Sequence, residues 1–529
     1  MIRPVHWLLL AVIVFGAGAM RFADLGGRPA GLFRDEAEKG YNGWALATTG
    51  GAIEFDPSLK TQIRWHPLPW MIDVVGVQTS ATYQYASIPF MWAGGLTVAT
   101  ARMAAAAAGT LAVLVIGLLL MHAWGPGAGL AAALWTALCP WHLVFSRWAL
   151  QGAFTPLFMA LVLAGLYGVE QRRRWGWPLA WAAMGWLFYT YSGAQPLVLA
   201  WGFFLLIIYR RELLRGGWPL AVGIALFLIP VIPTIVVTLR PGGSARWSNV
   251  SIFNQPGATF LSASLVFIKN YLAHFNPVAL FFHGDPNPRH CIPGAGQLAP
   301  IDLVLLPIGL VWTIRAKKPL AWALLAAWLC GPLPAAPTLG GMPHALRALG
   351  MALPSAVWGG AGLWLATRYV RERNARMHLD KLLWAAAIAV GLSLFALYWK
   401  TYANDPRAQV AFEKGERDAW VRIARDYKPG QRVLVSIQIP YAQYFQLFFF
   451  RMDPRKAADR GLGADFYYFD IALDKKNQFM NQMRPGDWMV TPVVPWRALS
   501  PSGEPLLPRE ESEIISENWV MAWQKPYTP

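Results

Sequence analysis

The sequence is short of the residues that a soluble protein of its length would carry. Only 14% of the 529 residues are charged, whereas 55% are hydrophobic and the mean hydropathy is positive. The three cysteines, Cys139, Cys291 and Cys330, form no closely spaced set, so a disulfide framework is not indicated. The chain also has no glycine-rich phosphate loop and no convincing internal repeat. These features argue against a soluble protein and favour a bundle of membrane-spanning helices.

Eleven apolar stretches approach the length of about 20 residues that a helix needs to cross a bilayer. Basic clusters fall in every second connection, around residues 172–174, 210–215, 315–318 and 368–376. Because lysine and arginine concentrate in cytoplasmic loops, we expect these connections and the N-terminus to be cytoplasmic. Residues 23–96, 239–299, 337–346 and the segment from 402 then lie outside. The spans are predicted at 5–22, 97–121, 127–144, 152–169, 177–194, 196–209, 218–238, 300–314, 319–336, 347–367 and 382–399.

The net charge of +17 does not indicate nucleic-acid binding. The basic residues lie in short clusters between apolar stretches, an arrangement that suits contact with anionic membrane lipids. Arg3, a short apolar core and Ala17-Gly18-Ala19 also resemble a secretory signal with a cleavage site. Under either interpretation of the first stretch, the loop that follows it is external.

The composition changes near residue 400, where the chain becomes richer in charge and in turn signals. We therefore expect two domains: a transmembrane domain at 1–400 and a soluble, external α/β domain at 401–529. Within the second, residues 411–427 are typical of an amphipathic helix, and residues 432–437 and 488–491 of short strands. This segment shows no nucleophile motif, phosphate loop or metal-ligand spacing, and its expected role is that of a lid or a docking domain.

Two adjacent carboxylates, Asp35 and Glu36, follow the first span. Residues 34–48 suit a short interfacial helix with both acids in its first turn, where the helix dipole favours negative charge. Capping of the helix is one interpretation of this pair. The other is that one carboxylate is a general base, which deprotonates an acceptor hydroxyl as it attacks a sugar carbon.

Three further features follow Asp35 and Glu36 in the sequence: residues 64–70 (RWHPLPW), Tyr83-Gln84-Tyr85, and Arg102 at the second span. Together with Asp35-Glu36-Ala37, this order resembles the membrane-embedded glycosyltransferases of the GT-C class, which use sugars carried on polyprenyl phosphate. It is most similar to the bacterial protein O-mannosyltransferase and aminoarabinose-transferase superfamily. Segments at 141–147, 187–191, 282–290 and 343–347 are also similar, so the resemblance covers roughly residues 1–400.

The resemblance implies an inverting enzyme of the bacterial inner (cytoplasmic) membrane. It would move a hexosyl or pentosyl group from a polyprenyl-phosphate donor to a hydroxyl of a protein, lipid or glycan at the external face. The catalytic base maps onto Asp35, with Glu36 beside it. Two departures stand out: Gln195 replaces a residue that is often basic, and the doubled proline of the family is interrupted in His66-Pro67-Leu68-Pro69. The expected substrate-binding residues are His66, Tyr85, Arg102, Arg147, Tyr191, His283, Asp285, His290, His344 and Arg347.

Arg147 and Arg347 are the residues best suited to hold the donor phosphate, because guanidinium groups bind phosphate oxygens at two points. An arginine that only extends its charge from a span end to water is the alternative for each. The loop from His283 to Cys291 also has the chemistry of a metal site, although we expect no required metal or other cofactor.

Two other classes of protein remain open. A transporter or flippase would carry charged residues inside its spans and paired repeats. A non-catalytic subunit of a polysaccharide assembly complex would depend on the surface of residues 402–529.

Overall fold

The computed structural model describes residues 2–55, 63–240, 243, 245–373, 378–469, 482–492 and 520–525. The chain forms two compact units. The helical unit comprises Met1–Ala23 and Ala105–Thr401, and the α/β unit comprises Asp24–Ala104 and Tyr402–Pro529. This division differs from the predicted domains 1–400 and 401–529, because residues 24–104 pack with the C-terminal segment. The residues at 470–481, 493–519 and 526–529 of the predicted C-terminal domain lie outside the described part.

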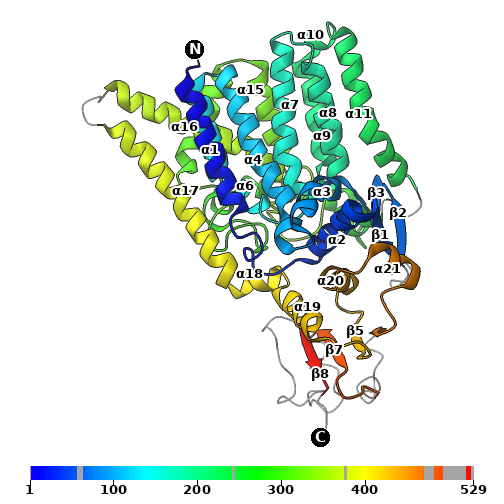
Figure 1. Cartoon of the computed structure of the whole chain (residues 1–529). Coiled ribbons are helices and arrows are strands. Elements are labelled where there is room, and N and C mark those ends of the chain that lie inside the picture. Colours follow the sequence, from blue (N-terminus) through cyan, green and yellow to red (C-terminus); the bar gives the residue numbers. More distant parts are fainter. Residues whose placement is uncertain are drawn as a thin grey trace. The chain divides into compact units, whose positions relative to one another are not determined.

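The helical unit is a bundle of helices, in which α7 (Thr155–Glu170), α8 (Gly176–Thr190) and α11 (Gly217–Thr238) run side by side (Figure 1). Each of the eleven predicted spans overlaps helical structure, and the span at 127–144 is divided between two helices, Pro126–Leu138 and Pro140–Phe145. Among the described residues, six helical segments are long and apolar enough to cross a membrane: Pro4–Phe22, Val98–Ala123, Gln151–Glu170, Gly217–Thr238, Leu349–Arg373 and Leu379–Asn404. The prediction of a mainly helical, polytopic membrane protein is therefore confirmed, while the count of about eleven spans stays a prediction.

The bounds of the helices in this unit follow the apolar pattern of the sequence closely. They are α1 (Pro4–Phe22), α4 (Val98–Ala123, which begins in the α/β unit), α5 (Pro126–Leu138), α6 (Pro140–Phe145), η1 (Gln151–Phe154), α7 (Thr155–Glu170), α8 (Gly176–Thr190), η2 (Ser192–Ala194), α9 (Gln195–Ile208), α10 (Arg210–Leu213), α11 (Gly217–Thr238), α12 (Ala245–Val250), η3 (Ile252–Asn254), α13 (Phe260–Ala273), η4 (Ala279–His283), α14 (Asp302–Arg315), α15 (Pro319–Cys330), η5 (Leu349–Met351), α16 (Ala352–Arg373) and α17 (Leu379–Asn404).

Small residues let the helices of the bundle approach closely. Gly362 of α16 lies against the backbone of Leu305 in α14, and Gly309 of α14 lies against the backbone of Trp358 in α16. A Cβ atom at either glycine would collide with that backbone. Close contact between small residues is the main source of helix association where lipid removes the hydrophobic driving force.

The first half of the α/β unit contains the loop with the candidate base. It consists of α2 (Arg34–Thr49), two antiparallel hairpins and α3 (Thr82–Gly94). The hairpins pair β1 (Gly51–Phe55) with β2 (Ile63–Pro67), and β3 (Met71–Val74) with β4 (Val77–Ser80). The helix predicted at 34–48 is thus confirmed as α2, with Asp35 and Glu36 in its first turn.

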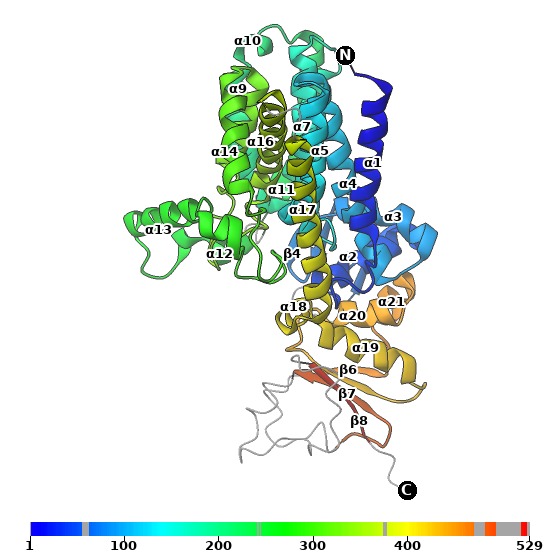
Figure 2. The same ribbon diagram turned by 90° about the vertical axis from the view of Figure 1, so that its left-hand side faces the viewer.

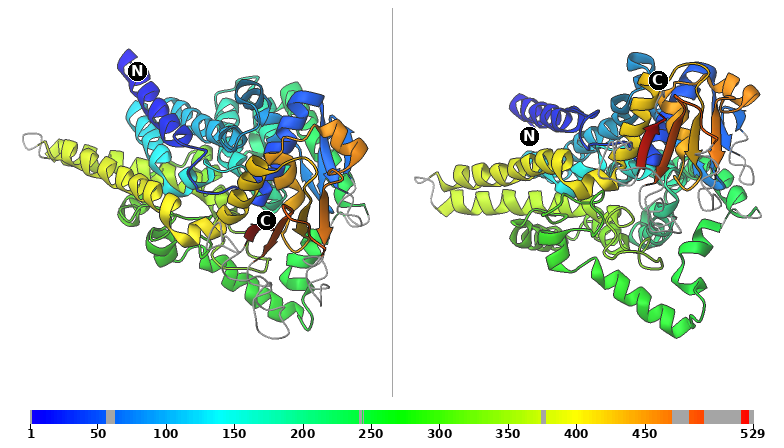
Figure 3. Two further views of the ribbon diagram at one scale, coloured as in Figure 1. Left: turned by 60° about the horizontal axis from the view of Figure 1, so that its bottom comes forward. Right: turned by 90° about the horizontal axis from the view of Figure 1, so that it is seen from below.

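The C-terminal half of this unit is built around a four-stranded sheet of order β6-β5-β7-β8. Figure 2 labels β6, β7 and β8, and Figure 3 shows the sheet from two other sides. Strand β5 (Val433–Ser436) pairs in parallel with β6 (Phe466–Phe469) and β7 (Trp488–Pro492), and β8 (Val520–Gln524) is antiparallel to β7. The helices are α18 (Pro406–Ala411), α19 (Lys414–Asp426), α20 (Ala442–Phe449) and α21 (Pro454–Arg460). The predicted helix at 411–427 and both predicted strands are confirmed.

One hydrophobic core joins the two halves of the α/β unit, with members from Leu32 to Ala101 and from Ala419 to Ala522. The hydroxyl of Tyr41 in α2 donates a hydrogen bond of 2.7 Å to the carbonyl of Met452. Gly40 lies against the ring of Phe448 with no room for a Cβ atom. These contacts fix α2 on the C-terminal segment, which the sequence alone did not indicate.

Candidate functional site

Glu36, in the first turn of α2, is completely buried. Its carboxylate accepts N–H groups from the Arg102 guanidinium at two points, each 2.8 Å long. It also accepts the backbone N–H of Phe33 at 3.0 Å, which caps the helix. Both the predicted capping role and a buried ion pair therefore apply to this acid.

Arg102 is likewise completely buried, and its remaining N–H groups are used within the same loop. They donate to the carbonyl oxygens of Leu25, Pro29 and Gly31 at 2.8 to 2.9 Å. All five guanidinium N–H groups are thus engaged. In this arrangement Arg102 positions the start of α2, and it has no donor left for a substrate.

Asp35 differs from its neighbour. It is half-buried, and its carboxylate makes no hydrogen bond or ion pair with the residues that the structure describes. Its backbone carbonyl accepts a hydrogen bond of 3.5 Å from the Lys39 ammonium. A carboxylate that is fixed on a helix, and that no described side chain binds, can accept a proton from a bound molecule.

Arg34 connects the start of α2 to the C-terminal segment. Its guanidinium forms an ion pair with Glu413, which also accepts the backbone N–H of Arg34 at 2.8 Å. Glu416, one turn further along α19, is buried in the same place. Burial and the nearby charge of Glu413 raise the pKa of Glu416 well above its ordinary value. Arg34, the residue before Asp35, is therefore bound to Glu413 by an ion pair that the sequence analysis did not predict.

A second buried acid, Glu38, lies one turn after Asp35. Its carboxylate accepts hydrogen bonds from Asn42 at 3.0 Å and Gln84 at 2.8 Å, and it pairs with Lys39 at 3.1 Å. This network joins α2 to α3. Lys39 and Asn42 are neighbours of Glu38 on α2, whereas Gln84 is 46 positions away and could not be assigned to it from the sequence.

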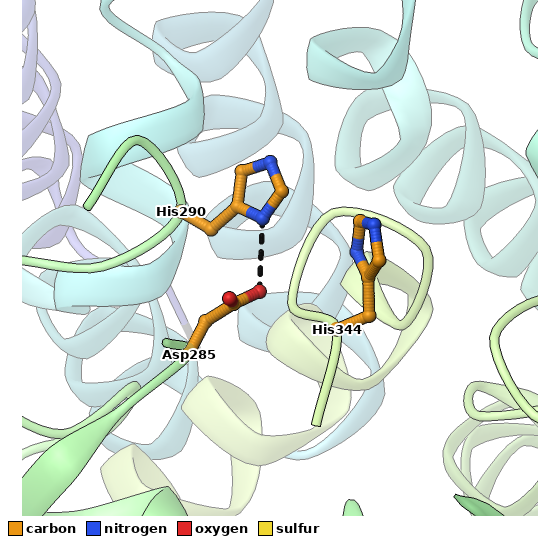
Figure 4. A group of neighbouring side chains, drawn as sticks. All are labelled: Asp285, His290 and His344. Atoms are coloured by element: carbon orange, nitrogen blue, oxygen red, sulfur yellow. Dashed lines mark hydrogen bonds and ion pairs between the residues drawn. The ribbon is translucent and has the colours of Figure 1, made fainter. Parts of the chain in front are cut away.

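In the helical unit, three predicted residues come together: Asp285, His290 and His344 (Figure 4). The Asp285 carboxylate and the His290 Nδ1 are 2.9 Å apart. The same carboxylate accepts the backbone N–H groups of Asn287 and Ala345 at 2.7 and 2.6 Å. The His290 and His344 rings lie 4.8 Å apart. Asp285 thus links the loop after η4 to the segment that contains His344.

Both histidines of this cluster are neutral at pH 7. Burial lowers the pKa of His290, and it outweighs the opposing effect of Asp285. Burial, together with the charges of His290 and Arg347, lowers the pKa of His344 to about 3. Burial alone would raise the pKa of Asp285, but the hydrogen bonds from His290 and the two backbone N–H groups bring it below its ordinary value. Asp285 is therefore ionised.

Arg347 lies beside the cluster. Its guanidinium donates to the Thr338 hydroxyl at 2.5 Å and to the Leu339 carbonyl at 3.1 Å. His274, which the sequence analysis missed, supports the same segment, since its Nε2 accepts the backbone N–H of His344 at 3.0 Å. The segment 338–347 is in this way fixed by side chains from several parts of the helical unit.

Arg147 lies in a segment that borders the cluster, since the rings of Phe145 and Trp148 lie 5.8 and 6.4 Å from that of His290. Its guanidinium donates to the carbonyls of Met20, Arg21 and Ala23 at the end of α1, and lies over the rings of Tyr398 and Trp399. A cation at the carbonyl end of a helix stabilises it. Arg147 therefore holds the end of α1.

The other predicted residues are dispersed. His66 is exposed on β2, 3.3 Å from Glu54, while Tyr85 is half-buried on α3 against the core of the α/β unit. Tyr191 is half-buried at the end of α8. His283 is exposed and forms no hydrogen bond with the described residues.

The cluster of Asp285, His290 and His344 has the donor atoms for a metal ion, which lie within 4.8 Å of one another. The neighbouring charges of Arg289 and Arg347, however, lower the pKa of His290 and would also oppose a divalent cation. One carboxylate beside two guanidinium groups suits an anion better than a cation.

Comparison with known proteins gives matches in structure alone: no family model and no curated protein sequence matches the chain. It is similar to ArnT from Cupriavidus metallidurans bound to undecaprenyl phosphate, with a TM-score of 0.58 and 15% identity, over 98% of each chain. It is also similar to the oligosaccharyltransferase AglB from Archaeoglobus fulgidus in complex with an inhibitory peptide and a dolichol-phosphate. That match has a TM-score of 0.50 and 13% identity, and covers 83% of this chain and 64% of AglB.

The chain therefore has the fold expected from its resemblance to the GT-C class. At these identities the likeness concerns the fold, and the roles of individual residues stay predictions.

Proposed function

We propose that this protein is a membrane glycosyltransferase that uses a sugar linked to a polyprenyl phosphate. The observation that carries the proposal is the Asp35 carboxylate, which is held at the start of α2 without a partner among the described residues, in a chain with a GT-C-like fold. The acceptor is a hydroxyl of a protein, lipid or glycan. The reaction takes place at the external face of the bacterial inner membrane, with the N-terminus in the cytoplasm.

In the proposed reaction, Asp35 takes the proton from the acceptor hydroxyl. The acceptor oxygen forms a bond to the anomeric carbon, while the bond from that carbon to the phosphate oxygen breaks. The polyprenyl phosphate leaves with the electron pair, and the configuration of the sugar inverts. Glu36 and Arg102 act as positioning residues, because their ion pair fixes the turn that carries Asp35.

The donor phosphate is bound by Arg347, beside the cluster of Asp285, His290 and His344. Arginine stabilises the negative charge that develops on the leaving phosphate. Asp285 accepts the Nδ1–H of His290 at 2.9 Å, so the Nε2 of the neutral ring is an acceptor, which suits a hydroxyl of the sugar or of the acceptor and not a phosphate oxygen.

The test is transfer from a panel of radiolabelled polyprenyl-phosphate sugars, with a membrane extract as the source of acceptors and release of polyprenyl phosphate as the measurement. We expect one donor to be consumed by the wild-type protein. Asp35→Asn should reduce the rate by about 10² to 10⁴, the usual contribution of a general base. Asp459→Asn is the matched control, because it removes an exposed carboxylate of α21 in the same unit and should leave the rate unchanged.

Retained transfer in Asp35→Asn would exclude this residue as the base. Absence of both binding and consumption across the panel would instead favour a transporter or a subunit without catalytic activity. For the phosphate site, Arg347→Ala should raise KM for the donor more than Arg347→Lys does, because lysine keeps the charge but loses the two-point contact.

A further inference from the structure

An apolar pocket lies between four helices of the helical unit. It has an empty volume of about 300 Å³. Side chains of α7, α8, α9 and α10 line it, among them Leu166, Trp177, Trp181, Leu206 and Leu213. Because the lining is aliphatic and aromatic, water inside the pocket would find few hydrogen-bond partners. The chemistry of the pocket therefore suits a hydrocarbon chain.

The pocket opens toward the outside of the bundle. Its inner wall includes Leu166 and Trp177, which are buried, whereas Leu206 on α9 is 45% exposed. Phe203 and Ile207, on either side of Leu206 in the same helix, are exposed as well. Since α9 falls on a predicted span, these exposed apolar side chains face lipid. An acyl chain of the bilayer can therefore enter the pocket from the side.

The pocket lies near the level at which the surrounding helices end. Tyr209, directly after α9, donates a hydrogen bond of 2.8 Å to Glu170 at the end of α7, and its ring lies 6.4 Å from that of Trp177. Figure 1 and Figure 2 show α10 at the same end of the helical unit as the N-terminus, which the charge pattern assigns to the cytoplasm. Trp218, shortly after α10, is exposed, as is usual for tryptophan at the boundary between lipid and water.

The two loops at this end of the unit are strongly basic. Six arginines in them are exposed and form no salt bridge with the described residues: Arg172, Arg173, Arg174, Arg210, Arg211 and Arg215. Arg210 follows Tyr209 directly and lies one turn before Leu213, which lines the pocket. Guanidinium groups bind phosphate oxygens at two points. An apolar pocket with cations at its rim matches a lipid that has an acyl chain and an anionic headgroup.

We propose that this pocket binds one acyl chain of an anionic phospholipid of the cytoplasmic leaflet, and that Arg210 and Arg211 hold the phosphate of the same lipid. The chain fills the space between α7, α8 and α9, and the headgroup joins α10 to the bilayer surface. This site is independent of the proposed transfer reaction, because it contains neither Asp35 nor any member of the cluster of Asp285, His290 and His344.

The headgroup preference is tested by native mass spectrometry of the protein purified in detergent. The protein is titrated with phosphatidylglycerol and with phosphatidylcholine that carry the same acyl chains. We expect the wild type to bind the first phosphatidylglycerol about 30-fold more tightly, since each of two basic residues near a membrane surface contributes roughly fivefold. Arg210→Gln with Arg211→Gln should abolish this preference. Arg371→Gln with Arg373→Gln, which removes two exposed charges from the end of α16, is the matched control and should keep it.

The pocket is tested by Leu206→Trp, because a larger side chain at this position fills the opening. We expect the affinity for both lipids to fall by roughly tenfold, as for the loss of about two buried methylene groups. Leu199→Trp is the matched control, since Leu199 is exposed on α9 two turns before Leu206 and does not line the pocket. Size-exclusion chromatography and the midpoint of thermal unfolding without lipid show whether the variants are folded.

Equal affinities of the wild type for the two lipids would overturn the assignment of the headgroup, and this comparison needs no variant. Equal affinities of folded Leu206→Trp and Leu199→Trp would overturn the pocket as the lipid site. A dimer without bound lipid in the same spectra would overturn the proposal in favour of a second copy of the chain that covers the pocket. Displacement of phosphatidylglycerol by an equal concentration of polyprenyl phosphate would assign the pocket to a polyprenyl chain instead.

Discussion

Glu36 and Arg102 form an ion pair from which solvent is completely excluded, with two contacts of 2.8 Å. The two residues are 66 positions apart in the sequence. Their pairing explains how adjacent acids in one turn of α2 come to have different tasks. The Glu36 carboxylate stabilises the loop through its contacts with Arg102, whereas the Asp35 carboxylate makes no hydrogen bond or ion pair in the described part of the chain.

The ion pair predicts a loss of stability when one partner is removed. Glu36→Gln leaves the Arg102 charge buried without a counter-charge, so we expect a loss of about 3–5 kcal/mol in the free energy of unfolding. Thermal unfolding in detergent should show a lower midpoint for Glu36→Gln than for Asp35→Asn. A Glu36→Gln protein of normal stability that has lost transfer would instead assign a catalytic role to Glu36 itself.

The tie between Arg34 and Glu413 predicts an effect of the C-terminal segment on the rate. Glu413→Gln weakens the hold of α19 on the start of α2, and misplacement of Asp35 should lower kcat by up to about 100-fold with little change in KM. The exchange Arg34→Glu with Glu413→Arg should restore part of the rate. Glu372→Gln, which breaks an exposed ion pair with Arg368, is the matched control and should have no effect. Equal rates in wild type and Glu413→Gln would show that this tie does not position the base.

The neutral state of His344 predicts a dependence of stability on pH. Its pKa is about 3 in the folded protein, against an ordinary value of 6.5. Between these values the unfolded chain binds a proton that the folded chain does not, so stability that is complete above pH 6.5 is lost as the pH falls. The midpoint of thermal unfolding should therefore decrease more between pH 7 and pH 4 in the wild type than in His344→Gln. Parallel curves would mean that His344 takes up its proton normally in the folded state.

Removal of metal should leave transfer unchanged. Arg289 and Arg347 lie near enough to lower the pKa of His290, and the same charges oppose a divalent cation at Asp285, His290 and His344. We expect wild-type rates after treatment with a chelator and dialysis, and no stoichiometric metal by elemental analysis. Loss of activity that zinc or manganese restores in the wild type, but not in His344→Ala, would establish a metal site.

Local sequence patterns were sufficient for much of the fold. Apolar length predicted a helix for every proposed span, and two acids followed by a good helix-forming segment predicted α2. The strands at 433–436 and 488–492 were also found, because short β-branched and apolar runs between turn signals have few alternatives. Such features depend on residues that are near one another in the chain.

The site could be predicted only in part. Asp285 and His290 are close in sequence, but His344 joins them because the backbone N–H of Ala345 binds the Asp285 carboxylate. No pattern in the sequence indicated that the Arg147 guanidinium would donate hydrogen bonds to the carbonyls at the end of α1. Helix α13 was missed because its apolar run is shorter than a span and lies in a loop that charge placed outside the membrane.

The sequence by itself determined that the chain is a polytopic membrane protein, because apolar length is a property of the chain as written, and the GT-C class was indicated by the resemblance of its motifs. The tertiary structure decided which charged side chains are bound to one another inside the protein. A buried guanidinium or carboxylate must find partners, and these come from wherever folding brings a carbonyl or an opposite charge within reach: Arg102 for Glu36, and Glu413, 379 positions away, for Arg34.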